Sequence, residues 1–121
     1  MKPLISHHLL LCATATKSKC CNPAIGQKSW IRLKEIINEL QLENPLRPEG
    51  IVLRSKVDCL RICSEGPILL VWPDGIWYKN VTPELIDLIV KNHIEEGNPL
   101  VNAIIKKTPL KKLYKCSVDK F

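Results

Sequence analysis

The spacing of apolar residues predicts a strand and then a helix in the N-terminal half of the chain. A continuous apolar run at residues 8–13 has no helical period, which is typical of a strand buried on both faces. From 28 to 42 apolar residues recur three and four positions apart, so this segment is predicted to be an amphipathic helix. Its apolar face comprises Trp30, Leu33, Ile37 and Leu40. The segment between them, 14–27, contains a proline and a glycine and is predicted to be a loop.

Apolar and alternating segments in the C-terminal half of the chain predict three more strands. We expect them at 51–57, 67–72 and 75–79. The last two are expected to form a hairpin across Pro73-Asp74. The segment 43–50 contains two prolines and a glycine, so it cannot continue the preceding helix and is predicted to be a connection.

A second helix is expected from residue 83 to residue 96. Thr82 can cap its start, proline suits its first position, and Gly97 can end it. Its apolar face comprises Leu85, Ile86, Leu88 and Ile89.

These elements together predict an α/β domain. Their order is strand, helix, strand, strand, strand, helix, which suits a central mixed sheet of about four strands covered by two main helices. Residues 1–100 are predicted to form this domain. Residues 101–121 have no place in it and are predicted to be a basic, flexible C-terminal tail.

The composition is that of an ordinary soluble globular domain. The 121 residues are 45% hydrophobic and 25% charged, and no apolar run approaches the roughly 20 residues that cross a bilayer. The net charge is +6, and much of the excess lies near the C-terminus. The lysines there are Lys106, Lys107, Lys111, Lys112, Lys115 and Lys120. We interpret them as a solvated end and expect no nucleic-acid partner.

The N-terminus faintly imitates a lipoprotein signal, because a short apolar stretch ends at Cys12. That stretch is too short for a signal and is broken by His7 and His8, so a buried strand explains it better. We therefore expect a cytoplasmic protein that keeps its thiols reduced and inserts into no membrane.

Five of the six cysteines fall into two groups. Cys12, Cys20 and Cys21 lie at the end of the first strand and in the loop after it. Cys59 and Cys63 lie in one loop between two strands. Four thiolates from two loops suit one inorganic centre. An iron–sulfur cluster is the commonest such centre in a reduced compartment, and zinc is the main rival.

Other interpretations of the cysteines remain open. Cys59 and Cys63 could be buried structural residues, or a redox disulfide, although that chemistry usually has Cys-x-x-Cys at the start of a helix. Only one of Cys20 and Cys21 can easily serve a four-cysteine site, because adjacent side chains diverge. The other one is predicted to be a bystander, as is Cys116.

Histidine ligation and side-chain catalysis are not expected. A Rieske centre needs a histidine two residues from a cysteine in each loop, and His7, His8 and His93 do not meet that requirement. The sequence also has no glycine-rich phosphate loop, no Ser/His/Asp set and no paired carboxylates. We therefore predict no catalytic residues.

Several segments together resemble the thioredoxin-like [2Fe-2S] ferredoxins. The resemblance covers roughly residues 7 to 100. Its most specific parts are Cys59 to Cys63 followed by Gly66-Pro67, and the hairpin Trp72-Pro73-Asp74-Gly75-Ile76-Trp77-Tyr78. The other parts are Leu10-Leu11-Cys12, the Cys20-Cys21 loop leading to Gly26, Val81-Thr82-Pro83-Glu84, and His93 through Pro99. The same domain resembles the small cluster-bearing subunit of respiratory complex I and of some hydrogenases.

The resemblance implies a thioredoxin-like fold with one [2Fe-2S] cluster per chain, often in a homodimer. By the family's motif, the ligands would be Cys12, Cys21, Cys59 and Cys63, with Cys20 as the alternative to Cys21. In the family this loop cysteine is followed by three residues and a glycine. Four residues separate Cys21 from Gly26 and five separate Cys20 from it, so Cys21 is the closer match.

The leading functional hypothesis is a soluble one-electron carrier between redox proteins. A second hypothesis is an accessory iron–sulfur subunit of a larger oxidoreductase. A third, from another class, is a zinc-stabilised interaction module without redox function. None of the three makes the chain an enzyme by itself.

Overall fold

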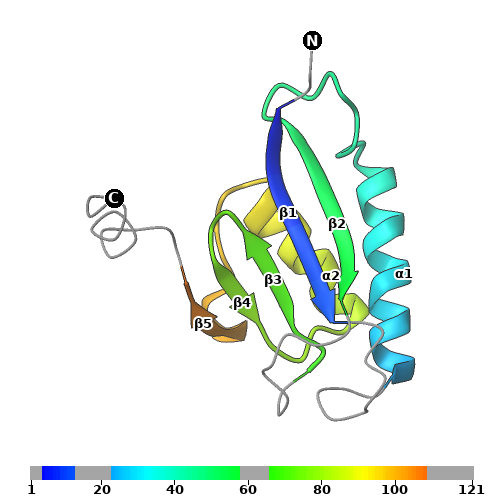
Figure 1. The fold of residues 1–121 in the computed structure, drawn as a ribbon, viewed down its shortest axis with the longest axis vertical. Coiled ribbons are helices and arrows are strands. Elements are labelled where there is room, and N and C mark those ends of the chain that lie inside the picture. The colour runs from blue at the N-terminus through cyan, green and yellow to red at the C-terminus, as the bar shows by residue number, and fades with distance from the viewer. Residues whose placement is uncertain (1–3, 13–22, 58–65, 109–121) are drawn as a thin grey trace, which may run out of the picture.

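The computed structural model describes residues 4–12, 23–57 and 66–108, which form a five-stranded sheet with helices on one face (Figure 1). The strands are β1 (Ile5–Cys12), β2 (Ile51–Val57), β3 (Leu69–Trp72), β4 (Ile76–Tyr78) and β5 (Ile104–Lys107), in the spatial order β2-β1-β3-β4-β5. β1 and β2 are parallel, whereas the other three neighbouring pairs are antiparallel. The predicted α/β fold with a mixed sheet is therefore confirmed.

The sheet extends past the predicted domain boundary at residue 100. A short 3₁₀ helix, η2 (Val101–Ala103), leads into β5, where Lys106 lies opposite Trp77 of β4. The Trp77 indole N–H also donates to the hydroxyl of Thr108, with 2.7 Å between nitrogen and oxygen. The sheet thus has five strands where about four were predicted, and its fifth strand, β5, lies beyond residue 100. Residues 109–121 lie outside the described residues.

Helix α1 (Pro23–Glu39) begins five residues before the predicted start at Lys28. The sequence predicts a loop at Pro23, but proline at the first position of a helix loses no intrahelical hydrogen bond and has a suitable φ angle. Gly26 is buried within the first turn. Farther along, the buried face comprises Leu33, Ile36 and Ile37, with Trp30 and Leu40 packed against it, as the spacing of apolar residues predicted.

The second predicted helix is present as two consecutive segments, α2 (Pro83–Leu88) and the π-helix η1 (Ile89–Ile94). The Thr82 hydroxyl accepts a hydrogen bond from the Leu85 backbone N–H at 3.3 Å, which confirms the predicted cap. Gly97 follows with a φ of +76°, and its N–H donates to the His93 carbonyl at 3.0 Å. Glycine adopts this left-handed conformation without strain, so it ends the helix as predicted.

The predicted apolar face of the second helix is wrong at one residue, Leu88. The residues that pack against the sheet are Ile86, Ile89, Val90 and Ile94. Leu88 is 50% exposed, because it lies on the side of the helix away from the sheet. A run of adjacent apolar residues, such as 88–90, does not by itself show which one faces the solvent.

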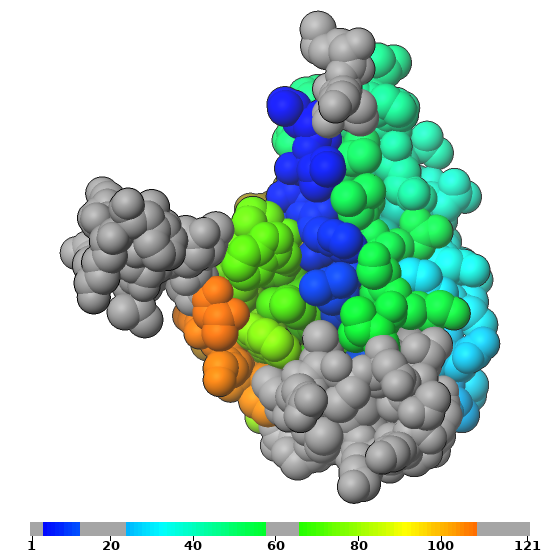
Figure 2. All heavy atoms as spheres, viewed as in Figure 1, coloured from blue at the N-terminus to red at the C-terminus, as the bar shows by residue number. Residues whose placement is uncertain are grey.

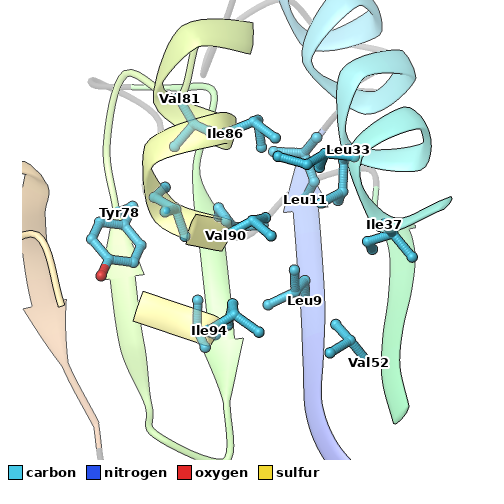
Figure 3. Packing of buried hydrophobic residues seen from close by; sticks show 14 of the residues in the cluster. Leu9, Leu11, Leu33, Ile37, Val52, Tyr78, Val81, Ile86, Val90 and Ile94 are labelled. Carbon is cyan, nitrogen blue, oxygen red and sulfur yellow. The ribbon is translucent and has the colours of Figure 1, made fainter. Parts of the chain in front are cut away.

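The core lies between one face of the sheet and the helices (Figure 3). Alternate residues of the strands point toward α1, α2 and η1, as the two-residue period of a strand requires. From the sheet these include Leu9, Leu11, Val52, Leu69, Val71 and Tyr78. The opposite face, toward the viewer in Figure 1, is covered by no helix of the described ranges, and β1 and β2 side chains lie at its surface in Figure 2.

Candidate metal centre

Cys12, the last residue of β1, is the predicted ligand that lies within the described residues. Its side chain is fully buried, and its backbone N–H donates to the Ile68 carbonyl oxygen at 3.0 Å. In the parallel pair, Cys12 lies opposite Val57, the last residue of β2. The thiol is therefore held at the point where two neighbouring strands both end.

Other elements are joined to this end of the sheet by hydrogen bonds. The Ser29 hydroxyl in α1 donates to the Val81 carbonyl at 2.6 Å, and both the hydroxyl and its residue are buried. The Val81 N–H donates in turn to the Pro67 carbonyl at 2.9 Å. Pro67 adjoins Ile68, which binds the Cys12 N–H. The N-terminal part of α1 and the segment before β3 are thus held beside the end of β1 (Figure 1).

The remaining predicted ligands lie outside the described residues. They are Cys20, Cys21, Cys59 and Cys63, and the predicted bystander Cys116 lies outside them as well. In the sequence, Cys21 is two positions before the first residue of α1. Cys59 is two positions after the last residue of β2. Both cysteines are therefore joined by short stretches of chain to elements that lie beside Cys12.

The histidines lie toward the other end of the sheet and interact with protein atoms. His8 Nε2 is 2.8 Å from the Ser55 hydroxyl oxygen. His93 is buried, with Nδ1 2.7 Å from the Tyr78 hydroxyl oxygen and Nε2 2.5 Å from a carboxylate oxygen of Asp74. Within the described ranges, no group of three or more His, Cys, Asp or Glu side chains is placed to hold a metal ion.

Tyr78, His93 and Asp74 form a hydrogen-bonded network that the sequence did not predict. Asp74 Oδ2 also lies 3.7 Å from His7 Nε2, and the Tyr78 hydroxyl accepts a hydrogen bond from the Leu100 N–H at 3.1 Å. Burial lowers the pKa of His7 below its usual 6.5, although the Asp74 carboxylate partly opposes this shift. Burial also raises the pKa of Tyr78. The signal for this network was the hairpin motif, in which Asp74 and Tyr78 are four positions apart.

Comparison with known proteins identifies the family, although no family model matches the chain. A 2Fe-2S ferredoxin of Clostridium pasteurianum is 33% identical over 91 residues, which cover 75% of this chain and 87% of the relative. The chain belongs to the [2Fe-2S] ferredoxin family. A 2Fe-2S ferredoxin of Aquifex aeolicus is 43% identical to this ferredoxin over 49 residues, 40% of this chain and 44% of the relative.

Solved structures agree with the thioredoxin-like fold that the sequence resemblance implied. A thioredoxin-like [2Fe-2S] ferredoxin from Aquifex aeolicus superposes with a TM-score of 0.71 at 24% identity, covering 86% of this chain and 94% of that one. A crystal structure of the wild-type Aquifex aeolicus protein superposes with a TM-score of 0.70 at 25% identity, covering 84% and 97%. The fold of this ferredoxin is therefore thioredoxin-like.

Membership of this family decides among the three functional hypotheses. A ferredoxin carries electrons and is not an enzyme, and relatives that are ferredoxins do not favour an accessory subunit or a zinc module. Across the described ranges, the structure contains no helix with the length and apolar character needed to span a membrane.

Proposed function

We propose that this ferredoxin binds one [2Fe-2S] cluster through Cys12, Cys21, Cys59 and Cys63, and that it passes single electrons from one redox protein to another. The observation that carries the proposal is the position of Cys12, which is buried at the common end of β1 and β2. The curated relatives named 2Fe-2S ferredoxins support the cluster type.

The connectivity of the chain supports this ligand set. A residue spans at most about 3.6 Å of extended chain, so two residues span at most about 7 Å. Cys59 is therefore within about 7 Å of chain from the end of β2, which lies beside Cys12. Cys21 is equally near the start of α1 along the chain. Cys63 is three positions before Gly66, where the chain returns toward β3.

These four cysteines suit a [2Fe-2S] cluster, because cysteine thiolates are the usual ligands of such clusters. When bound, the cluster supplies a reversible one-electron couple. The protein holds the ligands and sets their surroundings. Cys12 is shielded from water, and solvent exposure and hydrogen bonds to sulfur are the properties through which a protein adjusts the reduction potential.

Serine substitutions test the ligand set. Replacing Cys12, Cys59 or Cys63 by serine exchanges a soft thiolate for a harder, poorer ligand, so the visible spectrum should be lost or the potential displaced. Cys116→Ser is the matched control and should leave both unchanged. A normal spectrum in Cys12→Ser together with cluster loss in Cys116→Ser would contradict the assignment.

We also propose that this ferredoxin works in the cytoplasm, where thiols remain reduced, and that it forms a homodimer. The resemblance to thioredoxin-like ferredoxins supports the homodimer. Sedimentation equilibrium of the cluster-loaded protein tests it, since a mass of one chain at micromolar concentration would contradict the proposal.

A further inference from the structure

We propose that Trp30, Lys34, Arg54 and Lys56 form a docking surface for a redox partner whose contact face is rich in carboxylates. We call these four residues the basic patch. The inference rests on the proposed electron-carrier function and adds to it the location and chemistry of one docking site.

The basic patch is built where the edge strand β2 meets α1. Val52 of β2 is buried against α1, so Arg54 and Lys56, at the same parity along the strand, lie on that side of the sheet too. The Arg54 guanidinium carbon lies 5.6 Å from the centre of the Trp30 ring, and Lys56 Nζ lies 5.7 Å from it. Both distances are within the range of cation–π attraction. Lys34 is one helical turn beyond Trp30 and is exposed.

The basic patch lies at the cluster end of the molecule. In the pairing of β1 with β2, Lys56 is opposite Leu11, the neighbour of Cys12. Ser29, the neighbour of Trp30, is joined through Val81 and Pro67 to the segment that binds the Cys12 N–H. Figure 1 shows the ends of β1 and β2 beside the N-terminal half of α1. Strand alternation places the Cys12 side chain on the face of the sheet opposite Lys56, so a partner seated on this surface would reach the proposed cluster around the shared end of β1 and β2.

The charges of the basic patch are incompletely neutralised. Arg54 forms an ion pair with Glu43 at 2.9 Å, but its Nε atom is buried without a hydrogen-bond partner in the structure. Among the described residues, no carboxylate lies within 4.0 Å of the Lys34 or Lys56 ammonium group. By contrast, Arg32 on the α2 side of α1 is paired with Glu35, Glu39 and Asp87. Among the described residues, positive charge is therefore only partly compensated on the β2 side of α1, whereas it is paired on the α2 side.

This arrangement favours a particular kind of partner. Contact with the Trp30 ring holds two cations in place before binding, which reduces the conformational entropy lost on docking. The half-buried indole adds apolar contact area at the centre of the basic patch. Complementary charge mainly raises the association rate, and this effect weakens as salt is added.

The test is electron transfer from the reduced, cluster-loaded ferredoxin to oxidised flavodoxin, an acidic flavoprotein that accepts single electrons. Each event oxidises the cluster by one electron and reduces the flavin by one. The variants are Lys56→Glu, Lys34→Glu and the control Lys91→Glu, which changes the net charge equally. Lys91 is exposed in η1, two residues before His93, and His93 contacts Asp74 in the turn after β3, which is the end of that strand away from Cys12.

At low ionic strength we expect Lys56→Glu to slow the bimolecular rate about tenfold and Lys91→Glu less than twofold. The reduction in rate for Lys34→Glu should lie between these two. All three differences should shrink in 0.5 M salt, where the screening length is only about 4 Å. Equal effects of Lys56→Glu and Lys91→Glu would overturn the docking site while leaving the electron-carrier function intact.

A second measurement does not depend on the cluster. A carbodiimide joins lysine amines to carboxylates as amides and takes up the water that is lost. We expect cross-links from flavodoxin carboxylates to Lys34 and Lys56, and few to Lys91, when the peptides are identified by mass. Cross-links that favour Lys91 would overturn the docking site. If the protein carried no reducible cluster, the proposed function would fail and this measurement would still decide the docking site.

Discussion

Replacing Tyr78 by phenylalanine should destabilise the protein without affecting the cluster site. The Tyr78 side chain is fully buried, and its hydroxyl interacts with His93 Nδ1 at 2.7 Å and the Leu100 N–H at 3.1 Å. Phenylalanine keeps the ring in the core but leaves both of these polar groups without their partner. A lost hydrogen bond of this kind costs about 1 kcal/mol, and more where the remaining group is buried.

The expected loss in the free energy of unfolding is therefore about 2 kcal/mol. For a domain of this size, 1 kcal/mol corresponds to roughly 4 °C, so Tm should fall by roughly 8 °C. The assay is far-ultraviolet circular dichroism during heating of the anaerobic, cluster-loaded protein. The visible spectrum before heating should be unchanged, because the substitution removes only the hydroxyl, whose partners are His93 and Leu100, and keeps the ring in the core.

Thr108→Val is the matched control. It also removes one hydroxyl hydrogen bond, from the Trp77 indole at 2.7 Å, but both of those residues are partly exposed. Water can replace the lost partner there, so the cost should stay below about 1 kcal/mol. A fall in Tm for Tyr78→Phe that is no larger than for Thr108→Val would refute the view that the buried network stabilises the fold.

Three further predictions concern a turn, a titration and the adjacent cysteines. Gly50→Ala should cost at least about 2 kcal/mol in urea unfolding, because φ is +106° and an added Cβ would lie 2.8 Å from the Ser6 nitrogen; wild-type stability would contradict this. Because the pKa of His7 is lowered in the fold, the unfolded chain binds the proton first. His7 therefore contributes stability above pH 6.5 that is lost as the pH falls toward its folded pKa, by at most about 1.4 kcal/mol per pH unit. His7→Gln should flatten this part of the stability curve, and an unchanged slope would assign it to other groups. Cys21→Ser should disrupt the visible spectrum whereas Cys20→Ser leaves it nearly intact, and the opposite pattern would transfer the ligand role to Cys20.

Most of the fold could be predicted from local patterns. The apolar run of β1, the helical spacing of α1 and the Thr82 to Gly97 boundaries of the second helix each reflect an interaction within a short segment. β5 could not be predicted in this way. Lys106 and Lys107 are exposed, and the strand exists because its backbone pairs with the free edge of β4. The spacing of apolar residues does not predict backbone pairing between two strand edges.

The candidate site, like the fold, has a part that local sequence patterns predict and a part that they do not. The position of Cys12 at the end of a buried strand could be read from the sequence, because the strand and its last residue are local features. The basic patch could not, since it brings Trp30 of α1 together with Arg54 and Lys56 of β2. These residues are more than twenty positions apart, and only the tertiary arrangement places two cations on one ring.

The most direct test of the central claim is the metal content of the anaerobically purified protein, measured together with its visible spectrum. A [2Fe-2S] ferredoxin should contain two irons and two acid-labile sulfides per chain, and its visible absorption should bleach on uptake of one electron per chain. Stoichiometric zinc, with no visible absorption that a reductant can bleach, would contradict the account.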